Sequence, residues 1–225
     1  MKIGIIGGGG VGQALGAALL TLGHEVTLGI RTPSPEELAK PRPQGKPLAE
    51  WSAATGGKVV TMAEAASGAD LIINATAGEA SIAALTLAGA DNLAGKVLID
   101  LSNPLDFSQG FPPALSKPYS GHTSVGEQIQ AAFPAAHVVK AFNTVGVGII
   151  VNPGLITKDH DLFLSGNDAA AKATVTELAR GLGWKSFLDL GDIKGSRAQE
   201  TIVLVWLQVM GATGGTLHNL HVARA

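Results

Sequence analysis

The glycine-rich turn near the start of this chain constrains its fold more than any other feature. An apolar run at Lys2–Ile6 precedes glycines at positions 7, 8, 9, 10 and 12, and a helical apolar pattern over Val11–Leu22 follows. Gly7, Gly9 and Gly12 have the spacing G-x-G-x-x-G between a predicted strand and a predicted helix. In a dinucleotide-binding unit these glycines allow a tight turn, let the backbone approach a pyrophosphate, and let the helix pack on the strand. The helix N-terminus then presents N–H groups to phosphates.

Two other interpretations of this stretch are a glycine turn without a ligand and a membrane or secretory segment. Residues 3–23 carry no charge over 21 positions, which is long enough to span a bilayer. However, eight of these residues are glycine, only Lys2 precedes them, and no clear small-residue cleavage site follows. A buried strand and turn therefore explain the stretch better.

The second predicted strand indicates which dinucleotide is bound. The strand Glu25–Gly29 continues into Ile30-Arg31-Thr32, with no carboxylate at its end. Chains that bind NAD usually place Asp or Glu there, about 20 residues after the glycines, to bond the ribose 2′-hydroxyl. A guanidinium pairs with a 2′-phosphate instead. We therefore expect Arg31 and Thr32 to favour NADP(H) over NAD(H); the alternative is a solvated surface arginine.

Composition excludes several classes of protein. With 46% hydrophobic and 15% charged residues in 225, the chain is a folded globular protein. Its net charge of −2 gives no reason to expect nucleic acid or an anionic membrane as a partner. Cysteine is absent, which excludes disulfides, thiol catalysis and cysteine-ligated metals and fits a reducing, cytoplasmic setting. The six histidines are scattered, and we expect no metal site at His218 and His221.

Strands alternate with helices along the rest of the chain. Further strands are predicted at Lys58–Val60, Asp70–Ala75, Lys96–Leu101, His137–Phe142, Asp161–Ser165 and Lys185–Leu188. Further helices are predicted in broken form over Glu36–Thr55, from Thr61, over Glu79–Leu87 and Ser124–Phe133, over Asp168–Leu182 with Asn167 as cap, and from Ile193 onward. The proline-rich stretch Pro33–Pro47 indicates a surface excursion. Repeated βα units predict an α/β fold with a doubly wound (Rossmann) parallel sheet.

We expect an NADP-binding Rossmann domain over residues 1–190 and a C-terminal helical segment over residues 191–225. Within that segment Thr201–Met210 is apolar nearly all round, and it is too short to span a bilayer. Such a helix has to be buried, in the core or against another subunit. The pattern favours a homodimer contact.

Ligands of doubly wound folds lie at the carboxyl ends of the strands. This directs attention to three loops, Asn74–Glu79, Asp100–Pro104 and Lys140–Gly146. We expect them to border a nicotinamide through Ala75, Thr76, Ala77, Asn103, Ala141, Asn143 and Thr144. Small residues there leave room for a flat ring, and the Asn and Thr side chains can hold a carboxamide or a second ring; turn chemistry is the alternative for the asparagines.

The segment Ser120–Ser124 is a candidate cover for this pocket, and a helix cap by Thr123 or Ser124 is favoured over a catalytic role for His122. No nucleophile–base–acid set appears, and no Lys-x-x-x-Asn pair stands on a helix of a substrate domain. Hydride transfer between two flat cofactors needs alignment and exclusion of water more than acid–base groups.

Five segments together resemble the deazaflavin-dependent NADP oxidoreductases (coenzyme F420:NADPH oxidoreductases). These segments are Ile3–Gly12, Gly29–Arg31, Asp100–Pro104, Val138–Thr144 and Asp189–Asp192. The same elements are similar to the oxidoreductase domain of membrane ferric reductases and, more distantly, to the amino-terminal domain of pyrroline-5-carboxylate reductases. The resemblance covers nearly the whole chain. It implies that Gly9, Gly10, Val11 and Gly12 contact the pyrophosphate, that Arg31 contacts the 2′-phosphate, and that Asn74–Ala77 and Ala141–Thr144 face the nicotinamide and the acceptor ring.

The chain departs from the family pattern at three places. Gly8 stands where a Thr or Ser is common, Ile30 stands where a Gly-Ser-Arg run has Ser, and Ala77-Gly78 replaces a bulky Pro-Trp type segment. The last change predicts a wider or different acceptor pocket. The first hypothesis is hydride transfer between NADP(H) and a flavin-type acceptor, with coenzyme F420 favoured. The others are a small imine or carbonyl reductase and an NADPH-sensing protein without turnover.

Overall fold

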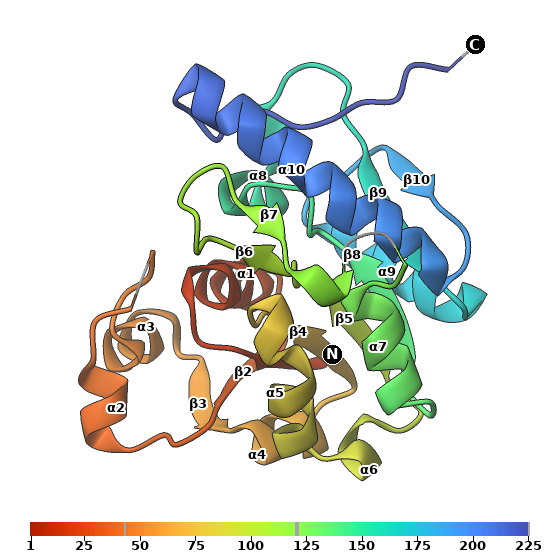
Figure 1. Cartoon of the computed structure of the whole chain (residues 1–225). Helices are drawn as coiled ribbons and strands as arrows, with labels where there is room; N and C mark the ends of the chain where they lie inside the picture. Colours follow the sequence, from red (N-terminus) through yellow and green to blue (C-terminus); the bar gives the residue numbers. More distant parts are fainter. Residues whose placement is uncertain (43, 120–121, 225) are drawn as a thin grey trace.

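Eight strands form one sheet among residues 1–42, 44–119 and 122–224, the part of the chain that the computed structural model describes (Figure 1). The strands are β1 (Lys2–Ile6), β2 (Glu25–Ile30), β3 (Lys58–Thr61), β4 (Leu71–Asn74), β5 (Val97–Asp100), β8 (His137–Ala141), β9 (Leu162–Gly166) and β10 (Phe187–Asp189). Their order is β10-β9-β8-β5-β4-β1-β2-β3. The order reverses between β1 and β4, which is the switch point of a doubly wound sheet. The predicted Rossmann fold is confirmed.

The pair β8 and β9 is antiparallel, whereas the sequence pattern predicts a parallel sheet throughout. The segment between them holds only the short helix α8 (Val147–Val151) and the turn η3 (Pro153–Leu155). Parallel neighbours need a crossover that carries the chain back to the starting edge, usually through a full helix. Helix α9 (Ala169–Gly181) provides one between β9 and β10, and that pair is parallel.

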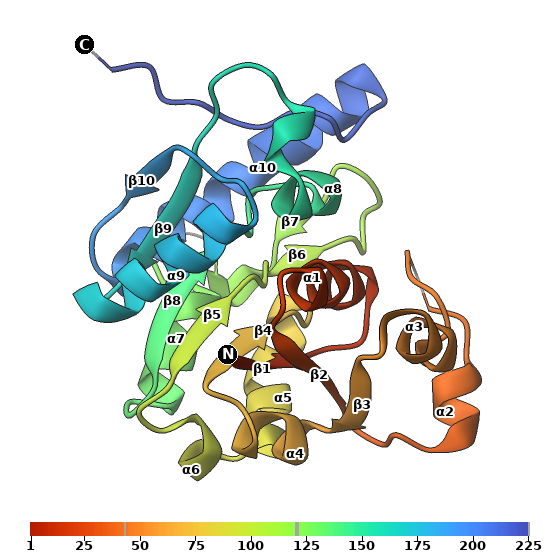
Figure 2. The ribbon, with the colours of Figure 1, turned by 180° about the vertical axis from the view of Figure 1, so that it is seen from behind.

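Helices cover both faces of the sheet (Figures 1 and 2). One face is packed by α1 (Gly10–Thr21), α3 (Leu48–Thr55), α8 and α9, and the other by α4 (Met62–Ser67), α5 (Ser81–Ala88), α6 (Ala90–Leu93) and α7 (Val125–Ala132). Ile5 and Ile6 are both fully buried but belong to different apolar clusters. Successive strand side chains point to opposite faces, so strands buried on both sides read as continuous apolar runs.

Some local predictions need correction. The cap of α9 is Asp168, whose Oδ1 accepts the N–H of Ala171 at 2.7 Å, and Asn167 instead accepts the N–H of Ile193 at 3.0 Å. Both residue types cap helices, so only the position three residues before the donating N–H of Ala171 decides between them. The last strand is shifted from Lys185–Leu188 to Phe187–Asp189. The short hairpin of β6 (Leu105–Asp106) and β7 (Ala114–Leu115) carries no alternating pattern and was not predicted.

The C-terminal helix α10 (Ser196–Thr213) follows the turn η4 (Ile193–Gly195) and crosses the molecule beside β9 (Figure 1). It buries Val203, Trp206 and Leu207 but leaves Val205 52% exposed. The apolar run is therefore not buried all round within one copy of the chain, and burial against another subunit stays a prediction. The division into residues 1–190 and 191–225 stays a prediction. Within the described residues, none of the helices combines the length and apolarity needed to cross a bilayer.

The remaining short elements are α2 (Pro35–Ala39), η1 (Gly78–Ala80) and η2 (Lys117–Tyr119). The proline-rich stretch around α2 leaves the sheet after β2 and returns at α3, as expected of an excursion, and Pro43 lies outside the described residues. In the segment predicted as a pocket cover, Ser120 and Gly121 also lie outside the described residues. Its last residue, Ser124, caps α7 by accepting the N–H of Glu127 at 3.1 Å, which confirms the cap interpretation.

Candidate functional site

The glycine turn joins β1 to α1 at the switch point of the sheet. Gly7 has φ +121°, a value that favours glycine, and a Cβ there would lie 2.6 Å from the carbonyl oxygen of Ala75. A Cβ on Gly12 would lie 2.3 Å from the carbonyl oxygen of Gly7. A Cβ on Gly9 would meet nothing within 4 Å. The fold therefore requires glycine at positions 7 and 12, while the open space at Gly9 agrees with its predicted role in ligand approach.

Helix α1 begins without a side-chain cap. Gly9 is its N-cap residue, and the first helical bond that the turn accepts runs from the N–H of Gln13 to the carbonyl of Gly9 at 3.0 Å. The N–H groups of Gly10, Val11 and Gly12 precede this bond, so they have no acceptor within the helix. Together with the helix dipole they form a site suited to a pyrophosphate.

Gln13 fastens the proline-rich loop to the glycine turn, a role that the sequence pattern did not indicate. Its buried side chain donates to the carbonyls of Gly8 (3.0 Å) and Lys46 (2.8 Å) and accepts the N–H of Lys46 (2.9 Å). The loop packs so closely that a Cβ on Gly10 would lie 2.3 Å from the carbonyl oxygen of Gln44. The only signal in the sequence is a polar residue on the buried side of an apolar helix.

A cavity of about 420 Å³ opens between the glycine turn and the end of β2. Arg31 and Thr32 line it, as the sequence predicts for residues that select the dinucleotide. Arg31 is exposed and makes no hydrogen bond or ion pair with any residue that the structure describes. Its guanidinium is therefore available to a ligand. The other residues of the wall are Gly7, Gly8, Ile30, Glu37, Arg42 and Met62.

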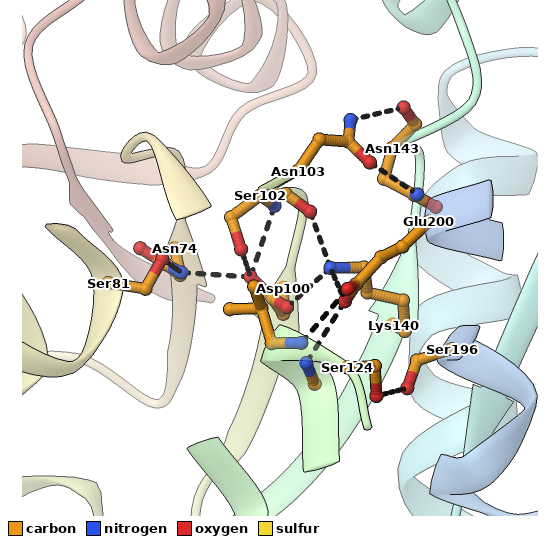
Figure 3. A network of polar contacts seen from close by, with 12 residues as sticks. Asn74, Ser81, Asp100, Ser102, Asn103, Ser124, Lys140, Asn143, Ser196 and Glu200 are labelled. Carbon is orange, nitrogen blue, oxygen red and sulfur yellow. Dashed lines mark hydrogen bonds and ion pairs between the residues drawn. The ribbon is translucent and has the colours of Figure 1, made fainter. Parts of the chain in front are cut away.

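The loop after β4 starts beside the glycine turn, because the N–H of Ala75 donates to the carbonyl of Ile6 at 2.9 Å. Asn74 is fully buried, and its amide donates to Ser81 (2.9 Å) and to Asp100 (2.8 Å). Figure 3 shows these contacts at the carboxyl ends of the strands. The hydroxyl of Thr76 donates to the Asn74 side chain at 2.7 Å. The Thr76 hydroxyl thus already has a partner within this loop.

Asn103 and Asn143 bond to each other across two of the predicted loops (Figure 3). The Asn103 amide donates to the Asn143 carbonyl at 2.7 Å, and the Asn143 amide donates to the Asn103 side chain at 2.9 Å. The Asn143 amide also donates to the carbonyl of Gln199 in α10 at 3.1 Å. These contacts give both residues a part in holding the loops together, and a contact with the nicotinamide carboxamide stays a prediction.

The other predicted residues lie close by, and Ala77 is exposed whereas the two from the end of β8 and the loop after it are buried. Ala141 ends β8 as a fully buried core residue, and Thr144 is 1% exposed. Between them Phe142 has φ +64°, which turns the chain sharply out of the strand. Ala77 precedes the turn η1, and a Cβ on Gly78 would lie 2.6 Å from the Asn103 carbonyl. The structure therefore brings the loops after β4, β5 and β8 together.

A buried ionic network lies beneath these loops and was missed by the sequence reasoning. Lys140 is fully buried, with its Nζ 2.8 Å from Asp100 Oδ2 and 2.8 Å from Glu200 Oε1, and it donates to the carbonyl of Ser102 (Figure 3). Burial alone would lower the pKa of Lys140, but the two carboxylates raise it above the ordinary value. Lys140 therefore stays charged. Because it is not exposed to a ligand, its role is structural.

One signal for this network was present in the sequence. Asp100 and Lys140 each directly follow apolar residues in their strands, and they occupy paired positions in neighbouring strands β5 and β8. A charge in a strand buried on both faces needs a partner of opposite charge. The pair could not be predicted from the sequence because the order of the strands in the sheet was not known.

The profile of the family described as "NADP oxidoreductase coenzyme F420-dependent" matches residues 2–104, from β1 to the loop after β5. A solved structure from Arthrobacter sp. FB24, described there as a candidate F420-dependent NADP reductase, is 47% identical over 100% of both chains, with a TM-score of 0.93. The chain belongs to the family of coenzyme F420-dependent NADP oxidoreductases. The expectations of an NADP-dependent oxidoreductase and of NADP(H) as its cofactor are confirmed at the level of this family.

Two curated relatives extend the likeness. The F420-dependent NADP reductase of Methanocaldococcus jannaschii is 29% identical over 96% of this chain and 96% of its own length. The metalloreductase STEAP3 of Rattus norvegicus is 30% identical over 90% of this chain. The chain spans only 36% of the length of STEAP3, so the activity of the whole STEAP3 protein is not assigned to this chain.

Proposed function

We propose that this F420-dependent NADP oxidoreductase family member transfers hydride between NADP(H) and a flavin-type acceptor, with the deazaflavin coenzyme F420 as that acceptor. The observation that carries the proposal is the Arg31 guanidinium, which has no partner among the described residues and lies in a cavity beside Gly7 and Gly8. An exposed cation at the end of β2, where NAD-binding chains place a carboxylate, suits a 2′-phosphate. When bound, the dinucleotide supplies the hydride that the reaction moves.

The chain's own residues bind and align the dinucleotide in this proposal. The turn formed by Gly7, Gly8, Gly9, Gly10, Val11 and Gly12 holds the pyrophosphate, and Arg31 and Thr32 hold the 2′-phosphate. Ala75, Thr76 and Ala77 on one side, and Asn103 on the other, border the nicotinamide, while the buried Ala141, Asn143 and Thr144 support this border from the end of β8 and the loop after it. The small side chains at positions 75 and 77 leave room for a second flat ring. Holding two rings face to face lowers the barrier through orientation.

The three ionisable groups buried beneath the loops suit a flavin-type acceptor better than a carbonyl. Reduction of a carbonyl needs a proton donor within reach of the substrate oxygen. Beneath the loops, Asp100 and Lys140 are fully buried and Glu200 is 1% exposed, and all three are joined in one ionic network. A ring that accepts hydride at a ring atom requires less from such groups. A cytoplasmic location, the absence of nucleic acid partners and a homodimer stay predictions.

Stopped-flow absorbance of the purified protein tests this proposal. NADPH and, in parallel, NADH are mixed anaerobically with the deazaflavin, FMN, FAD or a ferric chelate. We expect fast reduction of the deazaflavin with NADPH only. NADPH oxidation by an imine or a ketone, with no reaction of the deazaflavin or flavins, would favour the small-molecule reductase. Tight NADPH binding without any turnover would favour the sensor.

The variant Arg31→Ala tests the choice of donor in the same experiment. We expect it to weaken NADPH binding by about 1.5–3 kcal/mol, the range for hydrogen bonds to charged groups, and to leave NADH binding unchanged. Arg180→Ala is the matched control, because Arg180 lies on α9 with its Glu177 contact and is not part of the cavity wall. Equal affinity of the unchanged protein for NADPH and NADH would contradict the assignment.

A further inference from the structure

A second arginine lines the cavity at the end of β2. Arg42 belongs to the proline-rich loop after α2, and it forms part of the same wall of about 420 Å³ as Arg31 and Thr32. Its side chain is 21% exposed, and its Nε is buried without a hydrogen-bond partner among the described residues. Buried donors are nearly always paired in native proteins, so an unpaired one at a cavity wall points to an absent ligand.

One nitrogen of the Arg42 guanidinium is held by Glu37. This atom, Nη2, lies 2.7 Å from Glu37 Oε1 and donates to the Glu37 carbonyl at 3.1 Å. Glu37 also contacts Lys40, whose Nζ lies 2.6 Å from Glu37 Oε2. Two cations thus neutralise this carboxylate from both of its oxygens. Because the fork is fixed by Glu37 before a ligand arrives, little conformational freedom remains to be lost on binding.

The charges around the cavity decide which ligand suits it. In the wall, Arg31 and Arg42 carry two positive charges against the single negative charge of Glu37. An uncompensated carboxylate would favour a ribose hydroxyl and repel a phosphate. Here the balance is positive, and the wall holds two arginines whose Arg42 Nε and Arg31 guanidinium have no partner in the part of the chain that the structure describes. A phosphate dianion, which carries several hydrogen-bond acceptors, can bind the donors of both arginines.

We propose that Arg42 is a specificity-determining residue that binds the 2′-phosphate of NADP(H) through its Nε, together with Arg31. This inference rests on the proposed function, since it requires the adenosine end of the dinucleotide at this cavity. Arg42 supplies a donor held in position by Glu37, and Arg31 supplies an exposed one. Glu37 is then a positioning residue that orients Arg42 and has no ribose hydroxyl as its partner.

Equilibrium binding to four probes tests the inference on the whole chain. The probes are NADPH, NADH, adenosine 2′,5′-bisphosphate and adenosine 5′-phosphate, measured by calorimetry. For Arg42→Ala we expect affinity for the two 2′-phosphorylated probes to fall about tenfold or more, with the other two unchanged. Arg42→Lys keeps the charge but lacks Nε, so it recovers only part of the loss. Lys40→Ala is the matched control, since Lys40 contacts the same Glu37 outside the cavity wall, and it stays within about twofold.

The outcomes separate the inference from the proposed function. If the unchanged protein binds NADPH and NADH equally, the NADP(H) site itself is wrong. If it prefers NADPH and Arg42→Ala keeps that preference, the role of Arg42 is overturned. Equal loss for all four probes would show that Arg42 only supports the loop, which also overturns the inference. If Arg42→Ala does not fold, Arg42→Lys decides, because it retains the stem and the charge.

Discussion

Lys140 Nζ lies 2.8 Å from Glu200 Oε1, and this contact fastens helix α10 to β8 beneath the candidate acceptor site. Glu200 also accepts the N–H groups of Val125 (2.9 Å) and Gly126 (3.1 Å) at the start of α7. The C-terminal helix is thereby joined to the sheet and to a second helix through one buried carboxylate. The loops that border the proposed nicotinamide site rest on this junction.

Lys140→Met should destabilise the fold strongly, because it leaves Asp100 and Glu200 as buried carboxylates without a cation. Breaking such a pair from one side costs about 3–5 kcal/mol. Urea denaturation measures the free energy of unfolding. The matched control is Lys172→Met, whose partner Asp189 is 52% exposed, and for which we expect about 1 kcal/mol or less. Similar losses in both variants would contradict the role of the network.

Gly9→Ala and Gly12→Ala separate what the fold needs from what the ligand needs. Gly9 has φ −78° and open space around a Cβ, so its variant should keep its stability within about 0.5 kcal/mol. Its NADPH affinity should nevertheless fall about tenfold, because the new methyl group stands where the pyrophosphate approaches. Gly12→Ala should lose about 1–3 kcal/mol of stability from the clash with the Gly7 carbonyl. Full NADPH affinity in Gly9→Ala would contradict the proposed approach.

The backbone path follows from local patterns, whereas the contacts across the site do not. The apolar runs placed most strands within one or two residues, since a strand buried on both faces allows few polar positions. The Asp100–Lys140 pair depends on which strands are neighbours. Gln13 and Arg42 depend on a loop that folds back over α1 some thirty positions along the chain. No periodicity in the sequence encodes the return of this loop, so the roles of Gln13 and Arg42 were not predicted. The roles of the glycines and of Arg31 follow from local patterns and were predicted.

The C-terminal tail should detach in acid. Burial opposes ionisation of Asp161, but hydrogen bonds from Ser186 and the Val222 backbone, with the charge of His221, lower the pKa of Asp161. A lowered pKa adds stability above the unfolded value of about 3.9, and that stability is lost as the pH falls through the folded pKa. Hydrogen-exchange protection of the Val222 amide should therefore drop below about pH 4.

Asp161→Asn is the control for the tail, because asparagine accepts the same N–H and does not titrate in this range. Protection of Val222 in this variant should be lower at neutral pH and should not change with acid through the same interval. An acid transition of equal size in both proteins would assign it to another group.

The exposed side of α10 carries the predicted homodimer contact. Val205 belongs to the apolar run of this helix, and its side chain is 52% exposed. We expect sedimentation velocity to show a dimer at micromolar concentration and Val205→Lys to shift it toward monomer, since a buried unpaired charge opposes association. Thr201→Lys, an exposed position of the same helix at the polar end of the run, is the control. A monomer for the unchanged protein would refute the contact.

Isotope transfer tests the central claim, which is direct hydride transfer between NADPH and a deazaflavin. NADPH deuterated at both C4 positions of the nicotinamide is mixed with the protein and the deazaflavin in ordinary water, and the reduced ring is examined by mass spectrometry. The account predicts one deuterium bound to ring carbon in the reduced acceptor. Reduction without the label, or no reduction while NADPH stays bound, would contradict it.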